Sequence, residues 1–84
     1  MPVFRAEVRI KLKKGVADPE GQNTRRALEL LGFRGVSDVA SVKTFEITLS
    51  ARDQKAARQQ LDAMCRRLLA NPVIHNYGIA LRKR

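Results

Sequence analysis

Cysteine, histidine and aromatic residues are scarce in this chain. Its 84 residues include one cysteine, one histidine, one tyrosine, three phenylalanines and no tryptophan. A lone Cys65 excludes an internal disulfide framework and favours a reducing compartment. Cys65 and His75 together fall short of the three or four ligands that zinc needs, and no third group is available to orient a Cys-His nucleophile. The sequence therefore predicts neither a metal site nor a thiol-based active site.

Long hydrophobic runs and phosphate-binding motifs are absent as well. No segment approaches the ~18 apolar residues that cross a bilayer, and residues 1–5 lead into charged positions instead of a secretory segment. The five glycines form neither a GxGxxG nor a P-loop pattern, and capping or solvated positions account for the acidic residues. We therefore expect a cytoplasmic protein that binds no membrane and has no active site of its own.

Negative charge is also in short supply. Seventeen Lys and Arg residues against eight Asp and Glu residues give a net charge of +9, so a polyanionic partner has to be considered. An RNA-binding sheet of this size stacks bases on exposed aromatic side chains, whereas Phe4 and Phe45 are in phase with the apolar residues of their segments. A small basic RNA-binding ferredoxin-like protein is the alternative interpretation, but nucleic acid is not the expected partner.

The first half of the chain predicts a strand and a helix. Strict alternation of apolar and charged residues over residues 3–13 predicts a strand with one buried face. Asp18 followed by Pro19 is typical of a helix start, because Asp caps the first turn and Pro suits its first position. Apolar spacing extends this helix over residues 19–31, and Gly32 is the expected C-terminal cap.

A second helix is predicted after the middle of the chain. Residues 50–53 resemble a capping box, and apolar residues at helical spacing follow, with Cys65 and Leu68 on the buried stripe. The helix should run to about Ala70. Residues 71–72, Asn-Pro, should end it, because Pro cannot continue a helix.

The remaining segments complete a β-α-β-β-α-β order. Residues 36–49 are too long for one average strand and predict a hairpin with its turn near residues 40–43. Residues 74–82 predict a last strand, with His75 at the surface or in an interface. The order predicts one α+β domain, residues 1–84, with a ferredoxin-like four-stranded antiparallel sheet and both helices on one face. Such a compact chain has a radius of gyration of roughly 12 Å.

Several stretches resemble the PurS family, the small subunit of phosphoribosylformylglycinamidine synthase. They are Lys-Lys-Gly-Val at residues 13–16, Asp-Pro-Glu-Gly at 18–21, the apolar segment 27–33 and the segment 64–74. The positions that match family motifs are expected to have structural or interface roles: Asp18, Pro19, Gly21, Lys43, Glu46, Asn71, Pro72 and Tyr77.

The resemblance implies a function within an assembly. In the family, a large synthetase subunit uses ATP and Mg to activate formylglycinamide ribonucleotide, and a glutaminase subunit supplies ammonia from glutamine. The small subunit helps bring these two together, forms homodimers or homotetramers, and binds no cofactor itself. This chain departs from the family pattern at Val42, where glycine is usual, at residues 75–76, where an acidic pair is common, and in its high positive charge.

Overall fold

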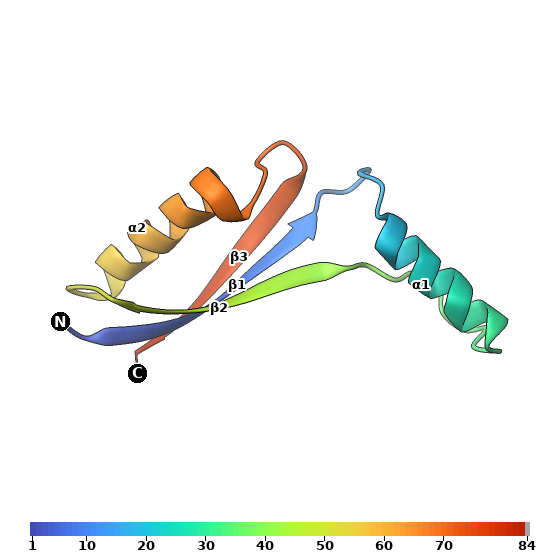
Figure 1. Ribbon diagram of the computed structural model, residues 1–84, viewed down its shortest axis with the longest axis horizontal. Coiled ribbons are helices and arrows are strands. Elements are labelled where there is room, and N and C mark those ends of the chain that lie inside the picture. Colours follow the sequence, from blue (N-terminus) through green and yellow to red (C-terminus); the bar gives the residue numbers. More distant parts are fainter. Residues whose placement is uncertain (84) are drawn as a thin grey trace.

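The computed structural model describes residues 1–83 (Figure 1). In chain order its elements are β1 (Val3–Leu12), α1 (Pro19–Leu30), β2 (Val42–Ser50), α2 (Gln54–Met64), the π-helical turn η1 (Cys65–Leu69) and β3 (His75–Lys83). The molecule is elongated, with extents of 52 × 27 × 14 Å and a Cα radius of gyration of 16.4 Å. It is thus more extended than the roughly 12 Å expected of a compact chain. Within residues 1–83 no helix has the length and apolar character needed to span a membrane.

Strand β1 is the centre of an antiparallel sheet with the order β2-β1-β3. Val8, in the middle of β1, pairs with Phe45 of β2 on one side and with Ile79 of β3 on the other. Every second residue of β1 from Phe4 to Ile10 is buried, and the residues between them are exposed. The alternation predicted for the first strand is therefore confirmed.

Helix α2 covers one face of this sheet and packs mainly over β3 (Figure 1). Its Leu61 is fully buried together with Val8 of β1 and Cys65 at the start of η1. The expected core position of Cys65 is confirmed, and burial raises the pKa of its thiol above the ordinary value. This thiol is a small buried hydrophobic group that is kept protonated.

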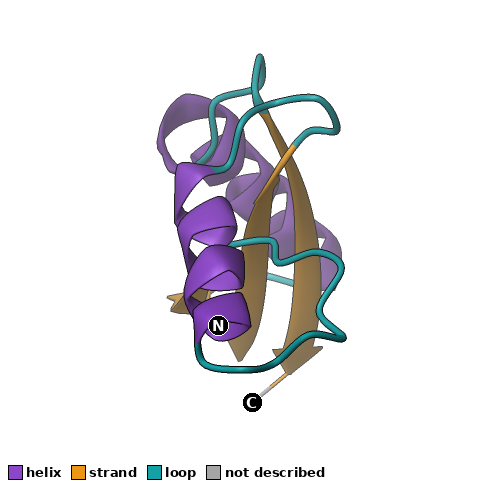
Figure 2. Cartoon of the chain, turned by 90° about the vertical axis from the view of Figure 1, so that its right-hand side faces the viewer, coloured by secondary structure: helices purple, strands orange, loops and turns teal. Residues whose placement is uncertain are grey.

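The expected hairpin at residues 36–49 is wrong, because only its second half is a strand. Among residues 1–83 the sheet has three strands, and α1 does not share a sheet face with α2. Residues 31–41 instead return along α1 toward β2, as Figures 1 and 2 show. Arg25 Nε on α1 donates to the Ser37 carbonyl at 3.2 Å, so this segment is bonded to the helix and is not part of the sheet. We call α1 and this return segment the arm (residues 19–41), and the sheet with α2 the body.

The C-terminal end of α1 has the predicted glycine cap. Gly32 has a φ of +99°, a left-handed conformation that other residues rarely adopt. Its N–H donates to the Glu29 carbonyl, and the Phe33 N–H donates to the Leu28 carbonyl, each at 3.0 Å. This pair of hydrogen bonds is a Schellman motif, which ends the helix and turns the chain back toward the sheet.

The capping box expected at residues 50–53 is wrong. Asp53 is itself the N-cap of α2, and its Oδ1 accepts the N–H of Ala56 at 2.8 Å. Ser50 is the last residue of β2 and pairs with Val3 across the sheet. Ser50 therefore lies three residues before the cap, too far ahead of the first turn of α2 to cap it.

The second helix ends in a π-helical turn rather than a regular one. The Ala70 N–H bonds to the Cys65 carbonyl, five residues earlier, at 2.9 Å. A π-turn holds one more residue than an α-turn and so rotates the side chains that follow it. As a result Leu68, which the helical spacing places on the buried stripe, is 83% exposed, while Leu69 is half-buried.

The shared burial of Leu61, Val8 and Cys65 predicts where stability resides. Leu61→Ala should lower the free energy of unfolding by about 2–5 kcal/mol, because it leaves a cavity under α2. Leu68→Ala makes the same chemical change at an exposed site and should alter stability by less than about 0.5 kcal/mol. Urea unfolding of both variants measures the difference, and equal losses would contradict this core.

Candidate interaction surfaces

The residues singled out by sequence do not meet in one cavity. They lie in three places: Asp18, Pro19 and Gly21 at the start of the arm, Lys43 and Glu46 on β2, and Asn71, Pro72 and Tyr77 in the η1–β3 connection and β3. Within residues 1–83 no three His, Cys, Asp or Glu side chains are grouped so that they could hold a metal ion. Each place is therefore described by itself.

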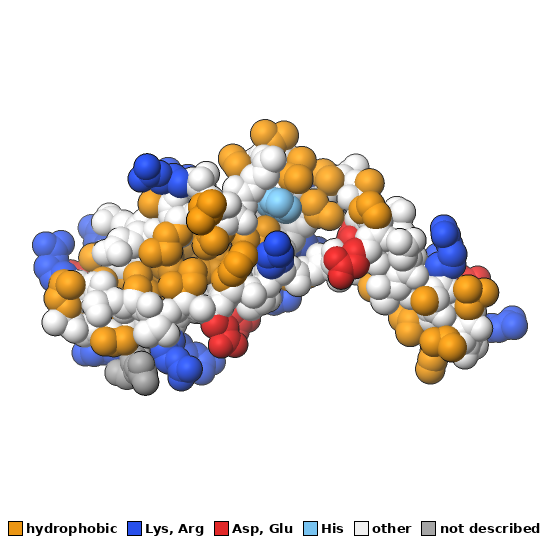
Figure 3. Space-filling model, in the orientation of Figure 1, with side chains coloured by type: hydrophobic (Ala, Val, Ile, Leu, Met, Phe, Trp, Pro, Cys, Tyr) orange, Lys and Arg blue, Asp and Glu red, His pale blue; other side chains and the backbone are white. Residues whose placement is uncertain are grey.

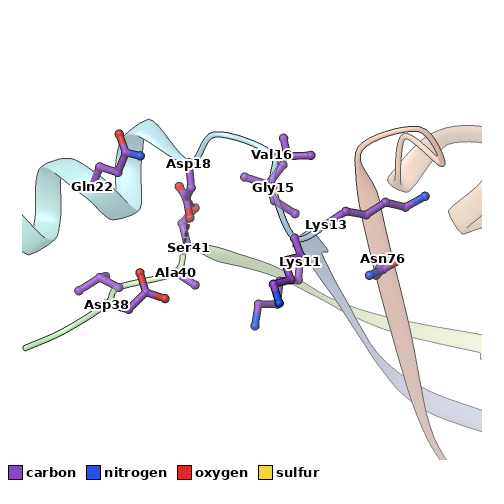
Figure 4. Close-up of a pocket in the computed structure, with 13 residues that line it drawn as sticks. Lys11, Lys13, Gly15, Val16, Asp18, Gln22, Asp38, Ala40, Ser41 and Asn76 are labelled. Carbon is purple, nitrogen blue, oxygen red and sulfur yellow. Dashed lines mark hydrogen bonds between the residues drawn. The ribbon is translucent and has the colours of Figure 1, made fainter.

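Two chain segments join the body to the arm, residues 13–18 and Ser41, and we call them the hinge. Asp18 lies in this hinge, beside a cleft of about 580 Å³ (Figure 4). Its Oδ1 accepts the Gly21 N–H at 2.9 Å and the Ser41 hydroxyl at 2.8 Å, and its Oδ2 accepts the Ser41 N–H at 2.8 Å. The backbone hydrogen bond from Ser41 is the largest cause that lowers the pKa of Asp18, followed by that from Gly21. The cap predicted from sequence is confirmed, and the link to Ser41 is a feature that sequence reasoning missed.

Gly21 is required at the hinge by close packing. A Cβ at this position would lie 2.3 Å from the Val39 carbonyl oxygen and 2.8 Å from Asp18 Oδ2. Gly21 is also the only buried residue of α1. Glycine therefore allows the return segment to approach the first turn of the helix, and Pro19 holds the first helical position beside it.

Lys43 and Glu46 lie on opposite faces of β2. Lys43 pairs with Ile10 on the face toward α2, and its ammonium lies 5.8 Å from the centre of the Phe45 ring. Glu46 pairs with Glu7 on the other face, where both carboxylates are exposed. The two residues do not form a joint site. The outer face that carries Glu46 also lacks aromatic side chains over residues 1–83, so base stacking on it is not supported.

The connection between η1 and β3 is held by several hydrogen bonds. Asn71 Oδ1 accepts the Val73 N–H at 3.0 Å, and the Asn71 N–H donates to His75 Nδ1 at 2.9 Å. The Pro72 carbonyl accepts the Lys13 ammonium at 2.8 Å. His75 is half-buried and serves as a hydrogen-bond acceptor for the turn. Asn71 and Pro72 thus order a turn that presents Val73, which is 77% exposed.

Tyr77 faces α2 from strand β3. Its hydroxyl donates to Asp62 Oδ1, and Asp62 also pairs with Arg66 at 3.0 Å. The hydrogen bond to the carboxylate is the largest cause that raises the pKa of Tyr77 above 10.0, because it favours the neutral phenol. Tyr77 therefore links α2 to the sheet, and its hydroxyl is engaged in this structural hydrogen bond.

Two exposed apolar surfaces were not recognised in the sequence. The first is the outer side and tip of the arm, where Leu30, Leu31 and Phe33 are 84%, 74% and 59% exposed. The second is a strip on β2, formed by Phe45, Ile47 and Leu49, which α2 covers only in part. Figure 3 shows apolar side chains gathered beside α2 and again at the far end of the arm. Helical spacing identified the apolar side of α1, but it gave no sign that this side lies outside the monomer core.

Single chains rarely expose apolar groups of this extent unless another chain covers them. The protein is therefore of the class that works through contacts between chains, on a three-stranded α+β fold. The model of the PurS family, described as phosphoribosylformylglycinamidine (FGAM) synthase, matches residues 5–83. The chain belongs to this family, as its resemblance indicates, and its place is in purine biosynthesis as a subunit of FGAM synthase.

Individual relatives agree with this assignment. The chain is 51% identical to phosphoribosylformylglycinamidine synthase subunit PurS of Archaeoglobus fulgidus, over 93% of this chain and 98% of that protein. The crystal structure of Methanocaldococcus jannaschii PurS matches with a TM-score of 0.87 and 43% identity, over 96% and 98% of the two chains. A chain in the structure of PurLQS from Thermotoga maritima matches with a TM-score of 0.88 and 25% identity, over the whole of both chains. The RNA-binding alternative finds no support among them.

The link between Tyr77 and Asp62 can be tested directly, because this is the only tyrosine in the chain. Spectrophotometric titration should show a pKa above 10.0, and Asp62→Asn should move it back toward that value. Stability from this link should be present at neutral pH and be lost as the pH rises through the raised pKa. Asp53→Asn removes a carboxylate at the other end of α2 and should leave the titration unchanged. An unshifted tyrosine in the wild type would contradict the contact.

Proposed function

We propose that this protein brings the glutaminase and the ATP-dependent synthetase subunits of FGAM synthase together, so that ammonia passes from one to the other. The observation that carries the proposal is the match over its whole length to a chain in PurLQS from Thermotoga maritima. The exposed apolar surfaces of arm and body supply contact area for association between chains. In this proposal the protein performs no chemical step.

The chemistry belongs to the partners. The synthetase uses ATP and Mg, the glutaminase uses glutamine, and this chain binds no cofactor. The described side chains support this division, because Asp18, Asn71 and Tyr77 are engaged in hydrogen bonds within the chain. The raised pKa of Cys65 also disfavours the thiolate that a glutaminase-type nucleophile requires. A cytoplasmic location is part of this proposal, and a chain with a single buried thiol is compatible with it.

The proposed assembly contains two copies of this chain, or a pair of such dimers. The arm exposes Leu30, Leu31 and Phe33 at and just beyond the end of α1, and the β2 strip is covered by α2 only in part. In an isologous dimer each arm lies on the β2 strip of the other copy. The contact occurs twice by symmetry, so both apolar surfaces of both copies are covered. The second helix that a ferredoxin-like sheet would have on this face is then supplied by the partner copy.

The dimer predicts an effect of charge on the arm. Leu31→Glu should weaken self-association by about tenfold or more, because it places a carboxylate in an apolar contact. Leu68→Glu is the matched control, since Leu68 is a similarly exposed leucine outside both surfaces. Sedimentation equilibrium at micromolar concentration measures both variants. A monomeric wild type, or a Leu31→Glu variant that associates normally, would contradict this arrangement.

Reconstitution tests the function itself. Omitting this chain from a mixture with its cognate synthetase and glutaminase should abolish most glutamine-dependent amidation, followed as ADP and glutamate release. High free ammonia should partly restore turnover, because ammonia from solution needs no docked glutaminase. Full glutamine-dependent turnover without this chain would refute the proposal, and so would turnover of ATP or glutamine by this chain alone.

A further inference from the structure

The arm has little to hold its direction except the hinge. Helix α1 does not pack on the sheet, and Gly21 is its only buried residue (Figure 1). Two chain segments join arm and body, one leaving β1 through residues 13–18 and the other entering β2 at Ser41. The relation between these two segments therefore determines where the arm points.

Asp18 connects the two segments. A helix cap needs only the hydrogen bond from Gly21 to Oδ1. The two further bonds, from the Ser41 N–H and hydroxyl, reach a residue 23 positions later on the other side of the hinge. Figure 4 shows the Asp18 carboxylate pointing from the outgoing chain to Ser41 on the returning chain. The Asp18 side chain thus links the outgoing chain, the first turn of α1 and the returning chain.

The packing around Gly21 also holds the two hinge segments close together. The Val39 carbonyl approaches to within 2.3 Å of where a Cβ of residue 21 would lie, so any side chain would push the returning chain away. On the body side, the Lys13 N–H donates to the Ile74 carbonyl at 2.8 Å, which anchors the outgoing chain at its start. The hinge is therefore held by close packing on the arm side and by a backbone hydrogen bond on the body side.

We propose that Asp18 is a positioning residue for assembly: through Ser41 and Gly21 it sets the angle of the arm to the body and so places the apolar face of the arm for its contact. The inference rests on the proposed function, since the arm is the surface through which assembly occurs. Preset geometry favours association, because an arm correctly placed for only one tenth of the time weakens apparent affinity about tenfold.

The test separates the cap from the cross-link. Asp18→Ser keeps a good N-cap for Gly21, but one hydroxyl oxygen cannot replace both carboxylate oxygens at Ser41. Asp53→Ser is the matched control, because Asp53 caps α2 through Ala56 without reaching another backbone segment. Both variants should retain their helices by circular dichroism.

Arm direction is measured by electron paramagnetic resonance distances between spin labels attached through Arg34→Cys on the arm and Gln60→Cys on α2. Both sites are exposed, whereas the native Cys65 is buried; labelled protein is diluted with unlabelled copies. Asp18→Ser should broaden the distance distribution and weaken self-association and binding to the synthetase–glutaminase pair by about tenfold. Asp53→Ser should leave the distribution and both affinities as in the wild type.

Two outcomes would overturn the inference. One is a narrow, wild-type distribution in Asp18→Ser, and the other is a broad distribution with undiminished assembly. The distance measurement does not depend on the other subunits. If the wild type assembles with neither partner, the proposed function fails by itself, and the assembly part of the inference fails with it.

Gly21→Ala, which pushes the same hinge open from the other side, should reproduce the effect of Asp18→Ser.

Discussion

The pairing of β1 on both of its edges is the interaction on which the rest of the structure depends. Its alternate residues, centred on Val8, make up the sheet side of the core, and Leu61 and Cys65 close that core from above. One strand and one helix face therefore supply nearly all of the fully buried apolar groups. Helix α2 leaves the β2 strip only partly covered, and α1 of the same chain does not pack there.

Because α1 does not pack on the sheet of its own chain, other contacts have to keep it ordered. An amphipathic helix loses the benefit of its apolar side unless that side is covered. Helix α1 stays ordered because the return segment runs along it, with Arg25 bonded to Ser37, and because Asp18 and Gly32 close its two ends. These interactions are polar and local. They stabilise the helix while leaving Leu31 and its neighbours exposed, which is the arrangement that an intermolecular contact requires.

Much of the local structure was predictable from sequence, although the capping box was not, and the long-range arrangement was not predictable either. The alternation of β1, the cap at Asp18 and the glycine at Gly32 each depend on residues within a few positions, and the structure confirms all three. The hairpin at residues 36–49 failed because its valines suit a strand and a half-buried return segment equally well. The predicted burial of Leu68 was wrong for a related reason. One extra residue in a π-turn moves a side chain off the buried stripe without any change of composition.

The motif residues show why the family was recognisable while the site was not. Asp18, Gly21 and Asn71 act on backbone groups: they accept N–H bonds or leave room for a carbonyl. Such roles demand one residue type at one position, so they make a specific sequence pattern. They hold the arm and the η1–β3 turn in place, and the exposed apolar side chains so presented are ordinary ones, such as Leu31, Phe33 and Val73. In a subunit that works by contact, the distinctive residues shape the backbone, and the contacting residues become visible only once their exposure is known.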